Sequence, residues 1–114
     1  EAFYRLKFQY LSEWLARSNP FHPVVRVWGA GRITRQRVAW LEELEVVVDG
    51  YYDVDPRKVG EPRQGLTVRF HEDLPPPGQE FVLVAVGGRG VREKVGAFLE
   101  GRNWVEGRDY LFVA

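Results

Sequence analysis

The chain has 114 residues, of which 45% are hydrophobic and 28% charged, a composition typical of one globular domain and too short for two. Its 16 Lys and Arg balance 16 Asp and Glu, so a broad basic surface for nucleic acid or anionic lipid is not indicated. Cysteine is absent, which excludes disulfides, cysteine-ligated metal sites and thiol nucleophiles.

Residues 1–17 form the first predicted element, a helix with an aromatic stripe. Its apolar residues recur at helical spacing: Tyr4, Phe8, Leu11 and Leu15, with Phe3, Tyr10 and Trp14 widening the stripe. Pro20 is expected to end the helix, because it biases the preceding residue away from the helical region. The stripe predicts a packing face, and the alternative is a surface that docks onto another part of a longer protein.

Strands and helices alternate along the rest of the chain. Runs of strand-forming residues predict strands at 24–28, 46–52, 66–70, 81–86 and 110–113. We expect Asp49-Gly50 to interrupt the second strand. Helical periodicity predicts helices at 33–44 and 91–99, a turn or short helix is expected at 56–60, and the prolines at 75–77 predict an exposed loop.

This alternation predicts the α/β class. The continuous apolar run at 81–86 favours a strand buried on both faces, as in parallel sheets. We therefore predict a three-layer, Rossmann-like parallel sheet of about five strands in the order 3-2-1-4-5, with an extra helix at the N-terminus. Residues 1–20 would be a linker helix packed on a Rossmann-like domain at 21–114.

The chain starts at Glu1 rather than Met, so we expect a single-domain piece of a longer protein. No apolar run approaches the roughly 18 residues of a membrane helix, and no segment is typical of a signal peptide. The expectation is a cytoplasmic protein without membrane insertion or a nucleic-acid partner.

The strongest motif is a predicted strand that runs into Gly29-Ala30-Gly31 and then into a helix. Gly29 would permit the tight turn, and Gly31 would let a phosphate approach the backbone N–H groups at the helix N-terminus. Thr34 stands where the usual GxGxxG pattern has its third glycine, which weakens a dinucleotide interpretation. The alternative is a tight turn in a Rossmann-like fold without a ligand.

An acidic residue, Asp53, follows the second predicted strand about 20 residues after the glycine turn, where ribose hydroxyls are usually held. Together with Asp55 it also spells DxD, a pattern that binds a metal and a sugar-nucleotide diphosphate in many glycosyltransferases. The alternative is an Asx turn that ends the strand before Pro56.

Arginines occupy the starts of two predicted helices, where the helix dipole disfavours cations. In a doubly wound sheet both helix starts face the crevice beyond the carboxyl ends of the first and fourth strands. We therefore predict a small anion-binding cleft, the alternative being solvated arginines that point away. The cleft would be lined by Arg32, Arg35, Arg89 and Arg92 with Gly29, Gly31, Gly87 and Gly88. Asp53 and Asp55 complete the set of candidate ligand-binding residues.

Catalytic signals are weak. His22 and His71 lack metal-ligand spacing to any second histidine, and the chain has no GxSxG, GxxxxGK[ST] or HExxH motif. We predict no catalytic residue and no metal site in this chain.

Four segments carry a family resemblance: VWGAG at 27–31, YYDVDPRKVG at 51–60, EDLPPP at 72–77 and VLVAVGGRGVR at 82–92. With GRDY at 107–110, they resemble the C-terminal Rossmann-like region appended to some bacterial family 2 glycosyltransferases, from about residue 21 to the end. The pattern is also similar to the nucleotide-binding domain of acyltransferases that act on nucleotide-linked aminosugars. That similarity implies nucleotide-sugar contacts at Gly29, Gly31, Asp53 and Arg92.

The resemblance implies an accessory domain of a glycosyltransferase that binds a nucleotide or nucleotide sugar and has no complete catalytic site of its own. Its partner would be the catalytic part of the same protein. The catalytic repeat domain of the acyltransferases has no counterpart in this sequence. Two alternatives remain: an NAD(P)-binding domain of an oxidoreductase, and an interaction module without a ligand that docks through its aromatic helix.

Overall fold

The computed structural model describes residues 2–60, 62 and 65–113, with the side chains of 2–5 and 32–35 outside the description. The elements in chain order are α1 (Ala2–Ser18), β1 (Val24–Trp28), α2 (Arg32–Glu42), β2 (Val47–Asp53), β3 (Val68–Phe70), the 3-10 helix η1 (His71–Asp73), β4 (Val82–Val84), α3 (Val91–Gly101) and β5 (Tyr110–Phe112). All neighbouring strands pair in parallel, in the order β3-β2-β1-β4-β5. The predicted fold class and strand order are confirmed.

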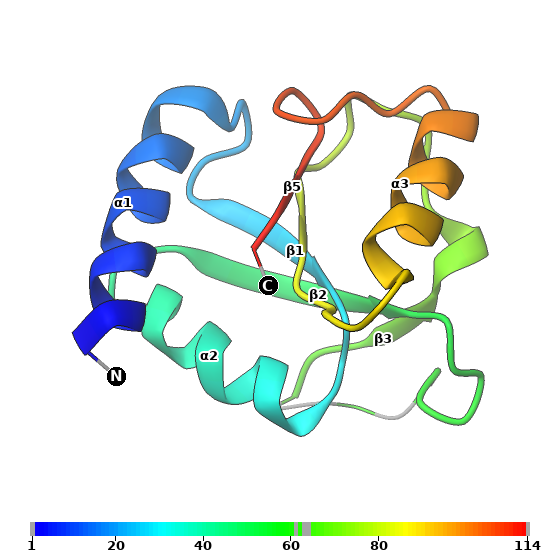
Figure 1. The fold of residues 1–114 in the computed structure, drawn as a ribbon, viewed down its shortest axis with the longest axis horizontal. Helices are drawn as coiled ribbons and strands as arrows, with labels where there is room; N and C mark the ends of the chain where they lie inside the picture. Colours follow the sequence, from blue (N-terminus) through cyan, green and yellow to red (C-terminus); the bar gives the residue numbers. More distant parts are fainter. Residues whose placement is uncertain (1, 61, 63–64, 114) are drawn as a thin grey trace.

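The sheet lies between two helical layers (Figure 1), with α1 and α2 on one side and α3 on the other. The alternation of side chains along each strand builds both cores. In β1, Val25 and Val27 join the core under α1 and α2, whereas Trp28 joins the core under α3. In and before β4, Leu83 and Phe81 face the first core, while Val82 and Val84 face the second.

Helix α1 packs on the sheet through the regularly spaced Phe8, Leu11 and Leu15, all of them buried. It also contacts α2, since the rings of Phe8 and Trp40 meet edge to face at 5.6 Å. One part of the predicted stripe does not pack, because Tyr10 is 64% exposed. The predicted Tyr4 and Phe3 contacts lie outside the described side chains.

The second strand is continuous, and the expected interruption at Asp49-Gly50 is a β-bulge instead. Val25 pairs with Val48 and Val27 with Tyr51, so a single β1 residue, Arg26, faces two residues of β2. The strand continues through Gly50 because β2 pairs with β1 both before and after the bulge.

No long helix covers the β2–β3 side of the second core within the described residues. There the segment 70–75 and the loop after α3 cover the sheet. Trp104 of this loop is buried and donates its indole N–H to the Pro75 carbonyl at 3.1 Å. The Trp28 ring lies 5.7 Å from His71 and 5.6 Å from Phe98. The tryptophans and tyrosines at 28, 51, 52, 104 and 110 are therefore core residues.

Candidate functional site

The candidate site lies at the carboxyl ends of the neighbouring strands β1 and β4. The strand order changes direction here, because β2 and β3 lie on one side of β1 whereas β4 and β5 lie on the other. Each of these strands ends in a glycine-containing turn followed by a helix, α2 after β1 and α3 after β4. The two helices then leave toward opposite faces, since Leu41 of α2 packs in one core and Leu99 of α3 in the other. In open α/β sheets this arrangement leaves a crevice beyond the carboxyl ends of the strands.

Gly29 is glycine for a structural reason. Its φ is +116°, a conformation that other residues rarely adopt, and its N–H donates to the Tyr52 carbonyl at 2.7 Å. A Cβ placed there would lie only 2.8 Å from Val86 Cγ1. Val86 belongs to the turn after β4, so Gly29 allows the two turns of the site to touch.

Gly31 differs from Gly29, because neither its backbone nor its surroundings require glycine. Its φ of −72° and ψ of 164° are open to any residue, and a Cβ would meet nothing within 4 Å. It is the N-cap of α2, and α2 therefore starts without a side-chain cap hydrogen bond. Helix α3 likewise begins at a glycine, Gly90, without a side-chain cap.

Two N-termini without side-chain caps therefore follow the adjacent ends of β1 and β4. The first N–H groups of a helix have no partner within the helix, and they carry a partial positive charge. Anions bind to such groups. At Gly31, the absence of a side chain leaves open space for a ligand to approach.

Asp53, the candidate ribose ligand, already has partners within the protein. It is 7% exposed; Oδ2 accepts the Ala30 N–H at 2.9 Å, and Oδ1 accepts the Asp55 N–H at 2.9 Å. Lys58 Nζ lies 3.8 Å from Oδ2. The carboxylate therefore ties the end of β2 to the glycine turn, and the Asx-turn alternative accounts for its bond to Asp55.

Asp55 lies in a separate local arrangement. The Arg57 side chain and backbone donate three hydrogen bonds to its carboxylate, at 3.0, 3.0 and 3.1 Å. These hydrogen bonds hold the pKa of Asp55 below its ordinary value. The carboxylates of Asp53 and Asp55 thus have different hydrogen-bond partners, and the described part of the chain contains no cluster of three or more His, Asp or Glu suited to a metal ion.

The four candidate arginines are placed differently. The guanidinium carbon of Arg92 lies 4.7 Å from the centroid of the Phe112 ring, which directs this side chain toward β5, on the far side of β4 from β1. Arg89 is exposed in the turn before α3, beside the exposed Gly87 and Gly88. The side chains of Arg32 and Arg35 are outside the described residues.

Sequence reasoning missed one cation near the glycine turn, Lys58. Its ammonium group lies close to the same Asp53 oxygen that accepts the Ala30 N–H. A basic residue in the turn that follows an acidic strand end was the available signal. Only the fold shows that this turn brings the Lys58 ammonium group back to Asp53 at the end of β2.

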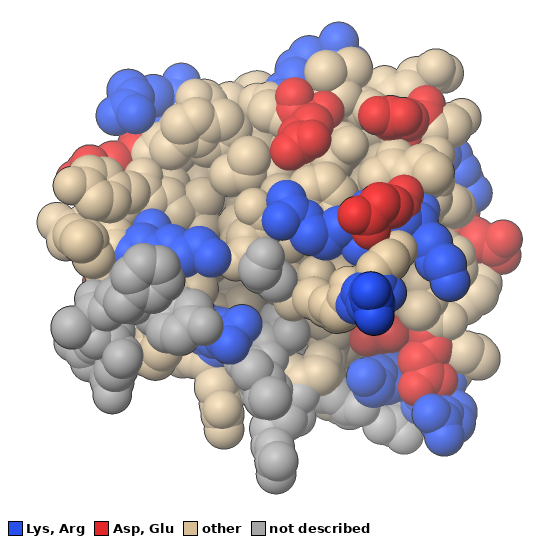
Figure 2. All heavy atoms as spheres, viewed as in Figure 1, with Lys and Arg blue, Asp and Glu red and all other residues tan. Residues whose placement is uncertain are grey.

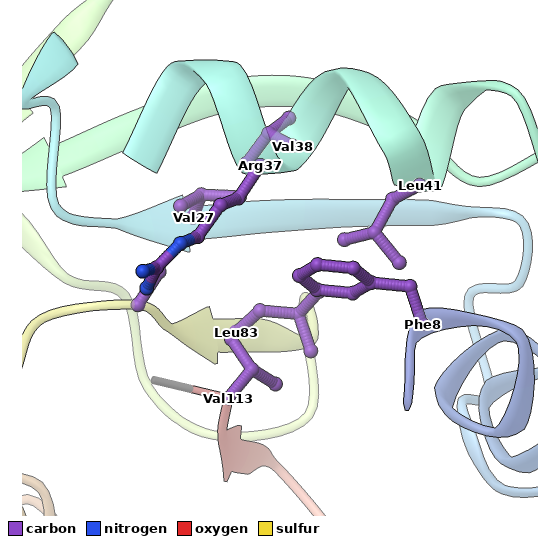
Figure 3. Close-up of a pocket in the computed structure, with 8 residues that line it drawn as sticks. Phe8, Val27, Arg37, Val38, Leu41, Leu83 and Val113 are labelled. Atoms are coloured by element: carbon purple, nitrogen blue, oxygen red, sulfur yellow. The ribbon is translucent and has the colours of Figure 1, made fainter. Parts of the chain in front are cut away.

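The cavity drawn in Figure 3 lies under α2, between this helix, the sheet and α1. It is lined by Phe8, Val27, Arg37, Val38, Leu41, Leu83, Ala85 and Val113. Its volume of about 10 Å³ is close to the limit for one water molecule. This cavity is a packing gap rather than a place for a nucleotide.

A second polar cluster lies toward the amino ends of β1 and β4. Arg26 Nε is 2.9 Å from Glu80 Oε2, and Arg26 also lies 3.6 Å from Asp49. Tyr52 donates its hydroxyl to Glu80. Burial and the neighbouring Glu80 raise the pKa of Tyr52 above its ordinary value. Because these charges pair with one another, the cluster anchors the loop before β4 to the sheet.

Neither histidine has a catalytic arrangement. His22 is exposed before β1. His71 packs between rings, 5.0 Å from Phe98 and 4.5 Å from Phe70, and its buried Nδ1 has no hydrogen-bond partner among the described residues. Its role is packing under the second core.

Neither the family models, the curated proteins nor the solved structures compared with this chain yield a match. The resemblance to glycosyltransferase-associated domains thus stays a prediction. Among the described residues, no helix combines the length and the apolar character that crossing a bilayer requires.

Proposed function

We propose that this chain is an accessory ligand-binding domain that holds the phosphate of a nucleotide or nucleotide sugar between the starts of α2 and α3. The observation that carries the proposal is the pair of N-termini without side-chain caps after adjacent strands, one of them beginning at a glycine that the fold does not require. The transfer chemistry would belong to a glycosyltransferase part outside this chain, as the resemblance implies.

The proposed binding is electrostatic and uses mainly the backbone. Phosphate oxygens would accept hydrogen bonds from the N–H groups in the first turn of α2. Gly31 leaves space for the phosphate to approach these groups. Lys58 adds positive charge beside the same turn, since its Nζ lies 3.8 Å from Asp53 Oδ2. Asp53 would shape the turn through the Ala30 N–H rather than contact the ligand.

An NAD(P)-binding oxidoreductase domain is less well supported. Asp53, the acidic residue that would bind the adenosine ribose, is 7% exposed and already accepts hydrogen bonds from two backbone N–H groups. Thr34 also replaces the third glycine of the dinucleotide pattern.

Replacing Gly31 by aspartate tests the proposal directly. A carboxylate at the N-cap would accept hydrogen bonds from the first N–H groups of α2 itself, which should stabilise the domain by only a few tenths of a kcal/mol while blocking the proposed phosphate position. Gln36→Glu is the matched control, because it adds the same charge at an exposed position further along the same helix.

Isothermal titration with uridine diphosphate, a uridine diphosphate sugar, inorganic phosphate and NAD supplies the measurement. We expect the uridine ligands to bind the wild type and Gln36→Glu within about threefold of each other, and Gly31→Asp to lose binding at least tenfold. Equal binding to Gly31→Asp and Gln36→Glu, or no binding to the wild type at millimolar concentration, would refute the proposal. Tighter binding of NAD than of the uridine ligands would instead favour the oxidoreductase alternative.

A further inference from the structure

An open groove lies between α1 and the edge strand β5. Its volume is about 450 Å³, and the residues that line it include Lys7, Tyr10, Leu11, Trp14 and Arg17 of α1 and Phe112 of β5. Figure 2 views the molecule from the side on which α1 and β5 lie, and uncharged surface is extensive there. The groove shares no lining residue with the proposed phosphate position.

The helix side of the groove is apolar and exposed. Tyr10 is 64% exposed, and Trp14 is only half-buried, with its ring 5.9 Å from that of Phe81. Leu11, which is buried, also lines the groove, so the three residues form a stripe at helical spacing of which Tyr10 and Trp14 are the accessible part. Exposed aromatic surface of this kind marks interaction sites more often than isolated apolar residues do.

The strand side of the groove offers backbone hydrogen bonds. In a strand, the backbone N–H and C=O groups of successive residues point to opposite sides. The Asp109 carbonyl and the Val113 N–H bond to β4, so the N–H and C=O groups of Phe112 point away from β4, toward the open edge. The Tyr110 carbonyl is occupied by the Gly107 N–H at 2.7 Å. No described residue pairs with the outward groups of Phe112, where an added strand could bond.

Both ends of the helix side carry positive charge. Lys7 and Arg17 have no ion-pair or hydrogen-bond partner for their side chains among the described residues. Their separation of ten positions on α1 corresponds to about 15 Å along the helix axis. In an extended segment, side chains four residues apart point the same way and stand about 13 Å apart, within reach of both cations.

We propose that this groove binds an extended peptide segment with two acidic side chains four residues apart and an apolar side chain midway between them. The segment would add to β5 at Phe112, place the apolar side chain against Tyr10 and Trp14, and pair its carboxylates with Lys7 and Arg17. This proposal uses a different surface from the proposed nucleotide binding and does not depend on it.

The test uses two synthetic peptides that differ only in charge, Ac-TEVFVET-NH2 and Ac-TKVFVKT-NH2. Fluorescence anisotropy of the labelled peptides gives the affinity, and amide chemical shifts locate the contact. We expect the glutamate peptide to bind at least tenfold more tightly than the lysine peptide and to shift the Phe112 amide. The paired change Lys7→Glu with Arg17→Glu should reverse this preference, while Tyr10→Ser should weaken both peptides.

Equal affinities for the two peptides, or no saturable binding at millimolar concentration, would overturn the proposal. Dimerisation of the chain with shifts at Tyr10 and Phe112, measured by analytical ultracentrifugation and amide shifts, would overturn it in favour of a second copy. Binding of phosphatidylserine vesicles in preference to the glutamate peptide would overturn it in favour of a membrane surface. Circular dichroism of each variant checks that the fold is retained.

Discussion

Substituting alanine for Gly29 should destabilise the domain strongly, because two separate features of the structure oppose a side chain there. The backbone has a φ of +116°, and the new Cβ would lie 2.8 Å from Val86 Cγ1. The perturbation is a single methyl group, and no hydrogen-bonding group is removed. Gly29 N–H can still donate to the Tyr52 carbonyl if the turn keeps its shape.

The size of the effect follows from three contributions. Backbone strain at such a φ costs about 1–3 kcal/mol. Relieving the overlap with Val86 adds about 1 kcal/mol, the lower end for an overpacked site, because Val86 is only half-buried and has room to shift. Alanine also restricts the unfolded chain, which returns about 0.4–1 kcal/mol. The expected net loss is about 1–4 kcal/mol of unfolding free energy.

Urea unfolding followed by tryptophan fluorescence measures this loss, since Trp28 precedes Gly29 and is 2% exposed. The matched control is Gly31→Ala, where φ is −72° and the Cβ meets nothing, so stability should change by less than about 1 kcal/mol. Combining Gly29→Ala with Val86→Ala should recover the overlap contribution of about 1 kcal/mol as a coupling energy. Equal effects of Gly29→Ala and Gly31→Ala would refute the reasoning.

Three further predictions concern the polar groups. Asp53→Ala should cost about 2–4 kcal/mol in urea unfolding, because two backbone N–H groups lose their acceptor, while Asp53→Asn, which keeps one acceptor, should cost less; equal costs would contradict this role. The raised pKa of Tyr52 favours the neutral phenol in the folded state, so its stabilising effect is complete below about pH 10 and falls as the pH rises further. Urea midpoints from pH 8 to 11 should therefore drop less steeply in Tyr52→Phe than in the wild type, and parallel curves would contradict this. Lys58→Gln should weaken uridine diphosphate binding about threefold to tenfold by calorimetry, the scale of one half-exposed charged contact, and an unchanged affinity would remove Lys58 from the proposed site.

The fold was predictable because its signals are local. The continuous apolar run before Gly87 marks a central strand, and Val95 and Leu99 mark one face of α3. Parallel pairing then restricts the order of strands to a few solutions. The expected break at Asp49-Gly50 was wrong because pairing with β1 before and after these residues carries the strand through a bulge, and one sequence does not reveal its pairing partners.

The candidate site was predictable only in part. The glycine turn and the helix that follows it are visible in the sequence, and the structure adds that Gly29 and Gly31 are glycine for different reasons. The bond from Ala30 to Asp53 joins residues that are 23 positions apart, so the internal role of this carboxylate appears only once β1 and β2 are paired. The stacking of Arg92 on Phe112 likewise depends on β5 lying beside β4.

The most direct test of the central claim is a map of amide chemical shifts during titration with uridine diphosphate. Binding at the proposed position predicts saturable shifts of the Gly31 amide and of the first-turn amides of α2, together with Gly88, and small shifts along β5. Shifts confined to surfaces away from both helix starts, or no saturable shift at millimolar ligand, would contradict the claim that this edge of the sheet binds phosphate.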